Sequence, residues 1–338
     1  MTSHLAIVGL GVLALLAGSD VAIAGATRLA RRLHLSDLVI GLTIVAIGTS
    51  LPELATTITG AIASGGTAAE DAAGVALGNI VGSNLFLLTA LLGLTGLMRD
   101  LPVSVGSIRR DGFVLLGFTA VLAWGFATGT LTRPFGALLL LAFVAYLAMV
   151  VRHEVSTATP EPTPEAPEAP ETSDGPDWTE SLTGRLPIPP GARDGLVVFA
   201  GLATVVGGAT LVVDHGVTIA ETVGIPGTLV GIFVGAATSL PEVVVSIRAA
   251  SRGTTDMAVG NILGSSITNL GLCLGAAAVA HPVVVPPMLL TLDYPFLAAS
   301  TVVALLLMKE REELSREEGA VLLVLFALYL ALRVRMGT

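Results

Sequence analysis

Apolar residues dominate the chain in ten long segments. The segments cover residues 5–26, 38–62, 74–97, 113–128, 135–151, 196–213, 229–248, 257–280, 292–308 and 320–332. A helix crosses a bilayer with about 20 mostly apolar residues, whereas a strand of a membrane barrel alternates apolar and polar positions over about ten. The unbroken apolar runs therefore predict an all-α polytopic membrane protein with ten transmembrane helices.

One polar stretch, residues 154–190, divides these segments into two groups of five. It consists largely of Pro, Glu, Thr, Ala and Ser, and cannot bury enough apolar surface to offset its chain entropy, so we expect a disordered acidic linker. Residues 1–153 and 191–338 are then two five-helix repeats. Because five is odd, the second repeat enters the membrane in the opposite sense, which predicts inverted repeats.

The composition agrees with a membrane protein. Of 338 residues, 53% are hydrophobic and 13% charged, against about a quarter charged in a soluble domain. Aromatic residues make up 4%, too few for the aromatic girdles of a barrel. Cys273 is the only cysteine, so an intrachain disulfide is excluded and we expect a small core residue. The net charge of −9 arises mostly in the linker and gives no reason to expect a nucleic-acid partner.

Basic residues predict the orientation. When the loops are assigned alternately to the two sides of the membrane, 14 of the 17 basic residues lie on the side of the linker. Arg133, Arg333 and Arg335 lie on the other side. The positive-inside rule then places the linker in the cytoplasm and both termini outside a cell membrane.

Two copies of a polar motif interrupt the apolar pattern. Residues 48–53 read Gly-Thr-Ser-Leu-Pro-Glu, and residues 237–242 read Ala-Thr-Ser-Leu-Pro-Glu. A carboxylate in lipid costs several kcal/mol unless it faces a partner or water, so Glu53 and Glu242 indicate a functional site. Pro52 and Pro241 predict a kinked or unwound helix at equivalent places of both repeats, a pattern typical of transporter sites.

A second motif follows each acid. Residues 78–84 read Gly-Asn-Ile-Val-Gly-Ser-Asn, and residues 260–265 read Gly-Asn-Ile-Leu-Gly-Ser. Glycines allow helices to approach closely, and the polar side chains beside them supply oxygen atoms. Together the four motifs predict one oxygen-rich metal site from the two acids, the neutral side chains Thr49, Ser50, Ser83, Thr238, Ser239, Ser265 and Asn269, and backbone carbonyls near Ala46 and Gly235.

Oxygen ligands favour a hard cation. Calcium takes six to eight oxygens, whereas zinc and copper prefer nitrogen or sulfur, and all five histidines lie in loops or at span ends. Two carboxylates neutralise one divalent cation, and in its absence the same oxygens can hold sodium ions or protons. Asp20 is either an outer partner of this site or a helix-packing residue. We expect Asn79 and Asn261 to be structural hydrogen-bonding groups.

The duplicated Thr-Ser-Leu-Pro-Glu and Gly-Asn-x-x-Gly-Ser motifs resemble those of the cation/calcium exchanger superfamily, specifically the prokaryotic sodium/calcium exchangers, and the resemblance spans nearly the whole chain. It implies that calcium is bound by Glu53 and Glu242 with the carbonyls of Thr49 and Thr238. It also implies sodium sites that draw on Ala46, Ser50, Ser83, Gly235, Ser239 and Ser265. The expected function is calcium/sodium antiport by alternating access, with transported ions but no cofactor, in which one chain suffices for transport.

Two positions differ in chemistry from the archaeal branch of that family: one loses its oxygen ligand, and the other keeps an oxygen but has no group that can carry a proton. An amide usually lies four residues after the serine of the first Gly-Ser motif, and an acid or amide four after the second; here these positions hold Leu87 and Asn269. Leu87 cannot bind an ion, so that contact is absent or is supplied by Asn84, about one helical turn away. Calcium/proton (or other cation/proton) exchange therefore stays the alternative, with a cation channel a remote one. An enzyme is not expected, because no intramembrane His or Cys pair supplies a nucleophile and base.

Overall fold

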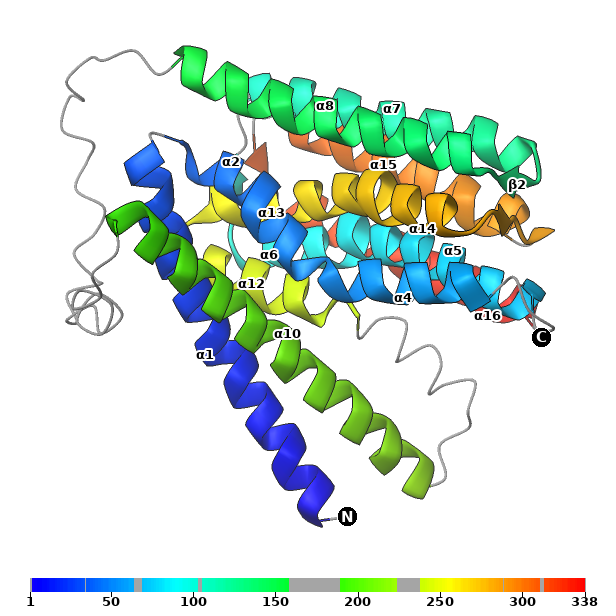
Figure 1. Cartoon of the computed structure of the whole chain (residues 1–338), viewed down its shortest axis with the longest axis horizontal. Coiled ribbons are helices and arrows are strands. Elements are labelled where there is room, and N and C mark those ends of the chain that lie inside the picture. Colours follow the sequence, from blue (N-terminus) through cyan, green and yellow to red (C-terminus); the bar gives the residue numbers. More distant parts are fainter. Residues whose placement is uncertain are drawn as a thin grey trace.

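The computed structural model is almost entirely helical and describes residues 2–33, 35–63, 69–102, 105–157, 189–223, 238–287, 289–310 and 313–337 (Figure 1). Before the linker the helical elements are α1 (Thr2–Leu33), α2 (Asp37–Ile40), η1 (Gly41–Val45), α3 (Ala46–Thr49), α4 (Leu51–Ala63), α5 (Ala69–Leu85), η2 (Phe86–Leu91), α6 (Leu92–Met98), α7 (Val105–Ala127) and α8 (Arg133–Thr157). The η elements are π-helical segments.

The second half begins with α10 (Pro190–Thr222). It continues with α12 (Leu240–Ser251), α13 (Thr255–Thr268), η3 (Asn269–Cys273), α14 (Leu274–Ala280), η4 (Leu289–Asp293), α15 (Tyr294–Glu310) and α16 (Arg316–Gly337). Helix α8 runs past the predicted linker start at residue 154 as far as Thr157, and Pro190 already belongs to α10. The rest of the predicted linker lies outside the described residues.

Eight helical runs in the described part of the chain are long and apolar enough to cross a membrane. The bent pair Asp37–Thr49 and Leu51–Ala63 makes a ninth when counted as one span. The predicted span at residues 229–248 overlaps residues 224–237, which the structure does not describe. Ten helices in inverted repeats therefore stay a prediction.

The polarity of the molecule is that of a membrane protein. Large apolar side chains such as Phe113, Leu141 and Phe199 are more than 60% exposed on the outside. Polar residues such as Glu53, Glu242 and Asn261, by contrast, are fully buried inside. Such an arrangement is stable where the surroundings are hydrocarbon and the polar groups have partners in the interior.

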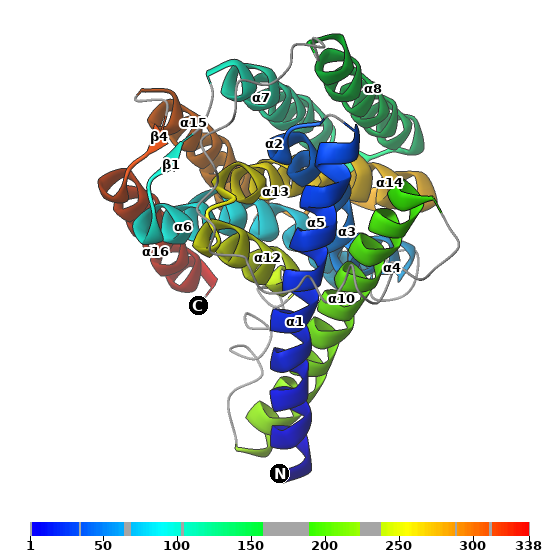
Figure 2. The same ribbon diagram turned by 90° about the vertical axis from the view of Figure 1, so that its left-hand side faces the viewer.

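Helices α1 and α10 form a pair that stands apart from the other helices. They pack against each other along their length, and their far ends project away from the rest of the molecule (Figures 1 and 2). Glycines permit the contact: a Cβ on Gly18 would lie 2.9 Å from the carbonyl oxygen of Gly201. The remaining helices form a thicker bundle, which we call the core.

Contacts within the core recur between the two halves of the chain. Helix α8 packs on α14, and helix α6 packs on α16. The first contact brings Gly136 against the Gly275 backbone, and the second brings Gly93 against the Gly319 backbone. Short strands also pair between the two halves: β1 (Leu101–Pro102) pairs with β4 (Glu313–Leu314), and β2 (Thr130–Leu131) pairs with β3 (Val283–Val284).

Candidate cation site

Glu53 and Glu242 both lie in the first turn of a helix inside the core. Helix α4 begins at Leu51 and α12 at Leu240, so Pro52 and Pro241 each occupy a position where no intrahelical N–H bond is needed. In the first half, the chain bends by 47° between Thr49 and Leu51, which confirms the predicted kink. Both glutamate side chains are fully buried.

Each glutamate accepts a hydrogen bond from the serine of the other motif. The Ser50 hydroxyl donates to Glu242 Oε1 over 3.0 Å, and the Ser239 hydroxyl donates to Glu53 Oε1 over 2.9 Å. The Ser239 hydroxyl also lies 3.1 Å from that of Ser83. The two predicted motifs, 186 or more residues apart in sequence, thus meet in one buried cluster.

The threonine of each Thr-Ser-Leu-Pro-Glu motif contacts the asparagine of the Gly-Asn-x-x-Gly-Ser motif in the other half of the chain. The Thr49 hydroxyl lies 3.3 Å from Asn261 Oδ1, and the Thr238 hydroxyl lies 3.2 Å from Asn79 Oδ1. The hydroxyl of Ser265 lies 3.4 Å from that of Thr49. Asn79 and Asn261 thus each accept a hydrogen bond from the threonine of the opposite half.

Two further hydroxyls that the motifs did not predict accept hydrogen bonds from these asparagines. Asn79 Nδ2 donates to the hydroxyl of Thr57 over 3.2 Å, and Asn261 Nδ2 donates to that of Ser246 over 3.0 Å. Thr57 and Ser246 each stand four residues after a motif glutamate, a spacing that places two side chains on one helix face. That spacing was the signal that could have identified them.

One oxygen of each motif carboxylate has no hydrogen-bonding partner in the described chain. Among the described residues, Oε2 of Glu53 and Oε2 of Glu242 are buried without a hydrogen bond, and neither carboxylate forms an ion pair with Lys, Arg or His. An unpaired buried charge is strongly unfavourable. The pair is therefore suited to binding cations, either metal ions or protons.

The helix that carries Ser83 offers one more free oxygen. Asn84 is fully buried, its Nδ2 donates to the Ile80 carbonyl over 2.8 Å, and its Oδ1 has no partner among the described residues. Leu87 is also fully buried and belongs to the π-helical segment η2. Asn84 therefore has one buried oxygen without a partner in the described chain, directly after Ser83 in sequence.

The matching position of the second half holds Asn269, at the start of η3. Its Nδ2 is buried without a partner in the described chain, while its Oδ1 lies 3.6 Å from the Cys273 Sγ. Cys273 is fully buried in the hydrophobic core, as expected, yet its Sγ lies 3.9 Å from the carbonyl oxygen of Ser50. The thiol therefore lies beside the polar cluster, which its apolar sequence neighbours did not indicate.

Two predicted positions, Ala46 and Asp20, differ from expectation, and a third is not described. The Ala46 carbonyl was expected to be freed by unwinding, but it accepts the Ser50 N–H over 3.1 Å and the Thr49 hydroxyl over 3.3 Å. The Ser265 hydroxyl approaches the same carbonyl at 3.5 Å. Gly235 lies outside the described residues. Asp20 does not join the cluster, because its carboxylate pairs with Arg248 and Arg252.

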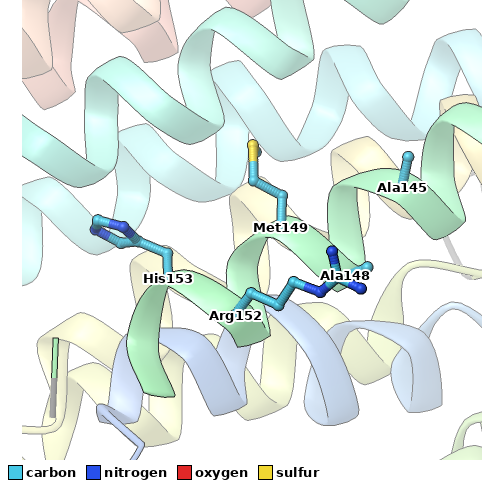
Figure 3. A pocket seen from close by; sticks show the side chains of 5 residues that line it. All are labelled: Ala145, Ala148, Met149, Arg152 and His153. Carbon is cyan, nitrogen blue, oxygen red and sulfur yellow. The ribbon is translucent and has the colours of Figure 1, made fainter. Parts of the chain in front are cut away.

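The surface hollow of Figure 3 is separate from this cluster. Its lining residues, Ala145, Ala148, Met149, Arg152 and His153, all belong to α8 (Figure 3). None of the predicted site residues lines it. Among the described residues, no group of three or more His, Cys, Asp or Glu is arranged as a metal site, so a cation between the glutamates would depend on neutral oxygens for the rest of its ligands.

Known proteins resemble this chain over almost its full length. The sodium/calcium exchanger MaX1 of Methanosarcina acetivorans is 31% identical, with 98% of both chains covered. The putative antiporter CaxA of Alkalimonas amylolytica is 33% identical over 94% of this chain and 95% of its own. Solved structures of the sodium-calcium exchanger NCX_Mj match with a TM-score of 0.78 at 27% identity, covering 97% of each chain.

The family model described as sodium/calcium exchanger protein matches residues 3–152 and 195–335, which leaves out only the termini and the region of the acidic linker. The two matched parts are the two groups of apolar segments that the sequence pattern separates. The chain therefore belongs to the sodium/calcium exchanger protein family.

Proposed function

We propose that the protein is a secondary active antiporter that exchanges calcium for sodium at one buried site between Glu53 and Glu242. The observation that carries this proposal is the pair of buried carboxylates, each bonded to a serine of the opposite motif and neither paired with a basic side chain in the described chain. Two negative charges in a dry interior match the charge of one divalent cation.

The neutral oxygens around the acids support competition between ions. The Ser50 and Ser239 hydroxyls contact the two carboxylates, the Ser83 hydroxyl contacts that of Ser239, and the Ser265 hydroxyl contacts that of Thr49. Calcium would take both carboxylates together with carbonyls of Thr49 and Thr238, while sodium ions would use the same two carboxylates together with the serine hydroxyls, Asn269 and the carbonyl of Gly235. Shared ligands make the two kinds of occupancy mutually exclusive, which is the condition for exchange.

We further propose that ten helices form two inverted repeats which work by alternating access. The reciprocal contacts support this: Ser50 to Glu242 and Ser239 to Glu53, α8 on α14 and α6 on α16, β1 with β4 and β2 with β3. A site at the contact of two such repeats lies near the middle of the membrane. With the linker in the cytoplasm and both termini outside, one chain in the cell membrane would complete the pathway.

Calcium flux into proteoliposomes tests the coupling ion. At fixed pH on both sides, an outward sodium gradient should drive calcium uptake, and an outward potassium gradient of the same size should not. Calcium uptake that is independent of the sodium gradient but driven by an imposed pH gradient would refute sodium coupling and favour calcium/proton exchange. The second outcome is a real alternative, because Leu87 replaces an expected ligand and the paired acids could carry protons.

A further inference from the structure

The sequence motif Gly-Ser-Asp at residues 18–20 ends in an acid that the cation site does not use. Asp20 lies in α1, and its side chain is 28% exposed. Its Oδ1 accepts a hydrogen bond from Arg248 Nε over 2.8 Å, and its Oδ2 lies 2.5 Å from Arg248 Nη2 and 2.9 Å from Arg252 Nη2. Two guanidinium groups thus converge on one carboxylate from another helix.

These arginines belong to the helix that carries Glu242. Helix α12 starts at Leu240, holds Glu242 in its first turn and Arg248 in its last, and Arg252 is its C-terminal capping residue. Helix α1 packs on α12 along the shared apolar cluster that includes Ala22, Val245 and Ala249 (Figure 2). The ion pair therefore joins α1 to one of the two helices on which the cation site is built.

Helix α1 is in turn joined to α10. Arg28 and Arg32 of α1 both pair with Asp194 of α10. At the far end of the same two helices, His4 Nδ1 and His215 Nδ1 are hydrogen bonded at 2.8 Å. Contacts at both ends, with close glycine packing between them, make the two helices one mechanical unit.

We propose that Asp20 is a positioning residue for the exchange cycle, whose ion pair with Arg248 and Arg252 holds the α1–α10 pair in one of its two arrangements against the core. The proposal rests on the proposed alternating access. A shift of the pair along α12 by one helical turn, about 5.4 Å, would break contacts of this kind. The ion pair consequently exists in one arrangement and not in the other, and it biases the equilibrium between them.

Solvent exposure limits how strongly the ion pair favours one arrangement. The side chains of Arg248 and Arg252 are 35% and 43% exposed, so the ion pair is partly screened. A contact of this strength can favour one arrangement without trapping the protein in it. A transporter needs that property, because both arrangements must be visited in every cycle.

Distance measurements between spin labels test the proposal without depending on which ion is carried. The labels are attached to Leu13→Cys on α1 and Leu141→Cys on α8, both well-exposed sites, in a Cys273→Ala background. In ion-free buffer, Asp20→Asn should change the ratio of the two distance populations by about fivefold, the size expected for a partly exposed ion pair. Arg248→Gln should shift it in the same direction, and the charge exchange Asp20→Arg with Arg248→Asp should return it toward the parent ratio.

The matched control is Asp194→Asn, which removes an Asp–Arg pair inside the α1–α10 unit. It should leave the ratio unchanged, although it lowers the thermal stability. Unchanged populations in both Asp20→Asn and Arg248→Gln, or an equal shift in Asp194→Asn, would overturn the proposal. If the parent protein showed no sodium-driven calcium flux, that result would count against the proposed function. It would not change the distance populations, which are measured in ion-free buffer.

Discussion

At the scale of single residues, Glu53 and Glu242 are buried without a basic partner in the described chain, which supports the proposed cation site. The duplicated motif predicted these acids and their serines, because an intramembrane carboxylate is costly without a function. Thr57 and Ser246 were not predicted, because a lone hydroxyl in an apolar helix usually bonds to the backbone of its own helix. The contact between Cys273 and Ser50 depends on tertiary packing that no local pattern contains.

Removing either charge should abolish calcium binding. Glu53→Gln and Glu242→Gln each leave one carboxylate to hold a divalent cation, and loss of one partner in a buried charge pair costs about 3–5 kcal/mol, or roughly 150-fold to 5,000-fold in affinity. Titration calorimetry in detergent measures this loss. Glu317→Gln, which changes an exposed acid in the first turn of α16, is the matched control and should bind like the parent. Calcium binding that survives in both mutants would refute the site.

Asn84→Ala should weaken the sodium dependence of exchange more than calcium binding. Its free Oδ1 is the oxygen we expect to replace the one missing at Leu87. The expected effect is a several-fold higher sodium concentration for half-maximal flux, from loss of about 1 kcal/mol of ligand interaction. Thr89→Ala is the control, because the Thr89 hydroxyl is already bonded to the Leu85 carbonyl. Equal behaviour of the two mutants would argue against an ion contact at Asn84.

At the scale of elements, the sequence predicted the broken helix at Pro52 and the position of most spans. Proline acts through its missing N–H and its ring, both local properties. The π-helical segments η2 and η3 were not predicted. Each follows the serine of its Gly-Ser motif by a few residues, and an extra residue in a helical turn depends on what the surrounding helices accept.

Glycine contacts between helices should be stability determinants. A Cβ on Gly136 would lie 2.6 Å from the Gly275 carbonyl oxygen, and a Cβ on Gly93 would lie 2.7 Å from that of Gly319. Gly136→Ala and Gly93→Ala should therefore lower stability by about 1–3 kcal/mol, as overpacking does. Thermal unfolding in detergent measures it.

Gly117→Ala on α7 is the control for these substitutions, because a Cβ there meets nothing within 4 Å. It should unfold at the same temperature as the parent or slightly above, since alanine favours the helix. If Gly136→Ala and Gly93→Ala were as stable as Gly117→Ala, the close contacts of α8 with α14 and of α6 with α16 would be wrong.

At the scale of the whole molecule, the two halves exchange contacts instead of forming separate bundles. The strand pairs join residues 101–102 with 313–314 and residues 130–131 with 283–284. Sequence reasoning predicted two halves from their repeated motifs and the linker, but not which helix meets which, because such pairings have no local signature. Only the meeting of the two acid motifs followed from the chemistry of an unpaired charge.

The orientation of the chain can be tested with an impermeant thiol reagent on intact cells. Ser3→Cys and Glu317→Cys introduce exposed thiols, and the native Cys273 is buried. The distribution of basic residues predicts that the first is labelled and the second is labelled only after the membrane is opened. The reverse pattern would invert the proposed topology.

Anomalous scattering from crystals soaked with strontium, which stands in for calcium, tests whether calcium and sodium share one site. We expect one strong peak between the carboxylates of Glu53 and Glu242 that disappears when sodium replaces strontium. A peak elsewhere, or one that persists in excess sodium, would contradict a shared site for exchange.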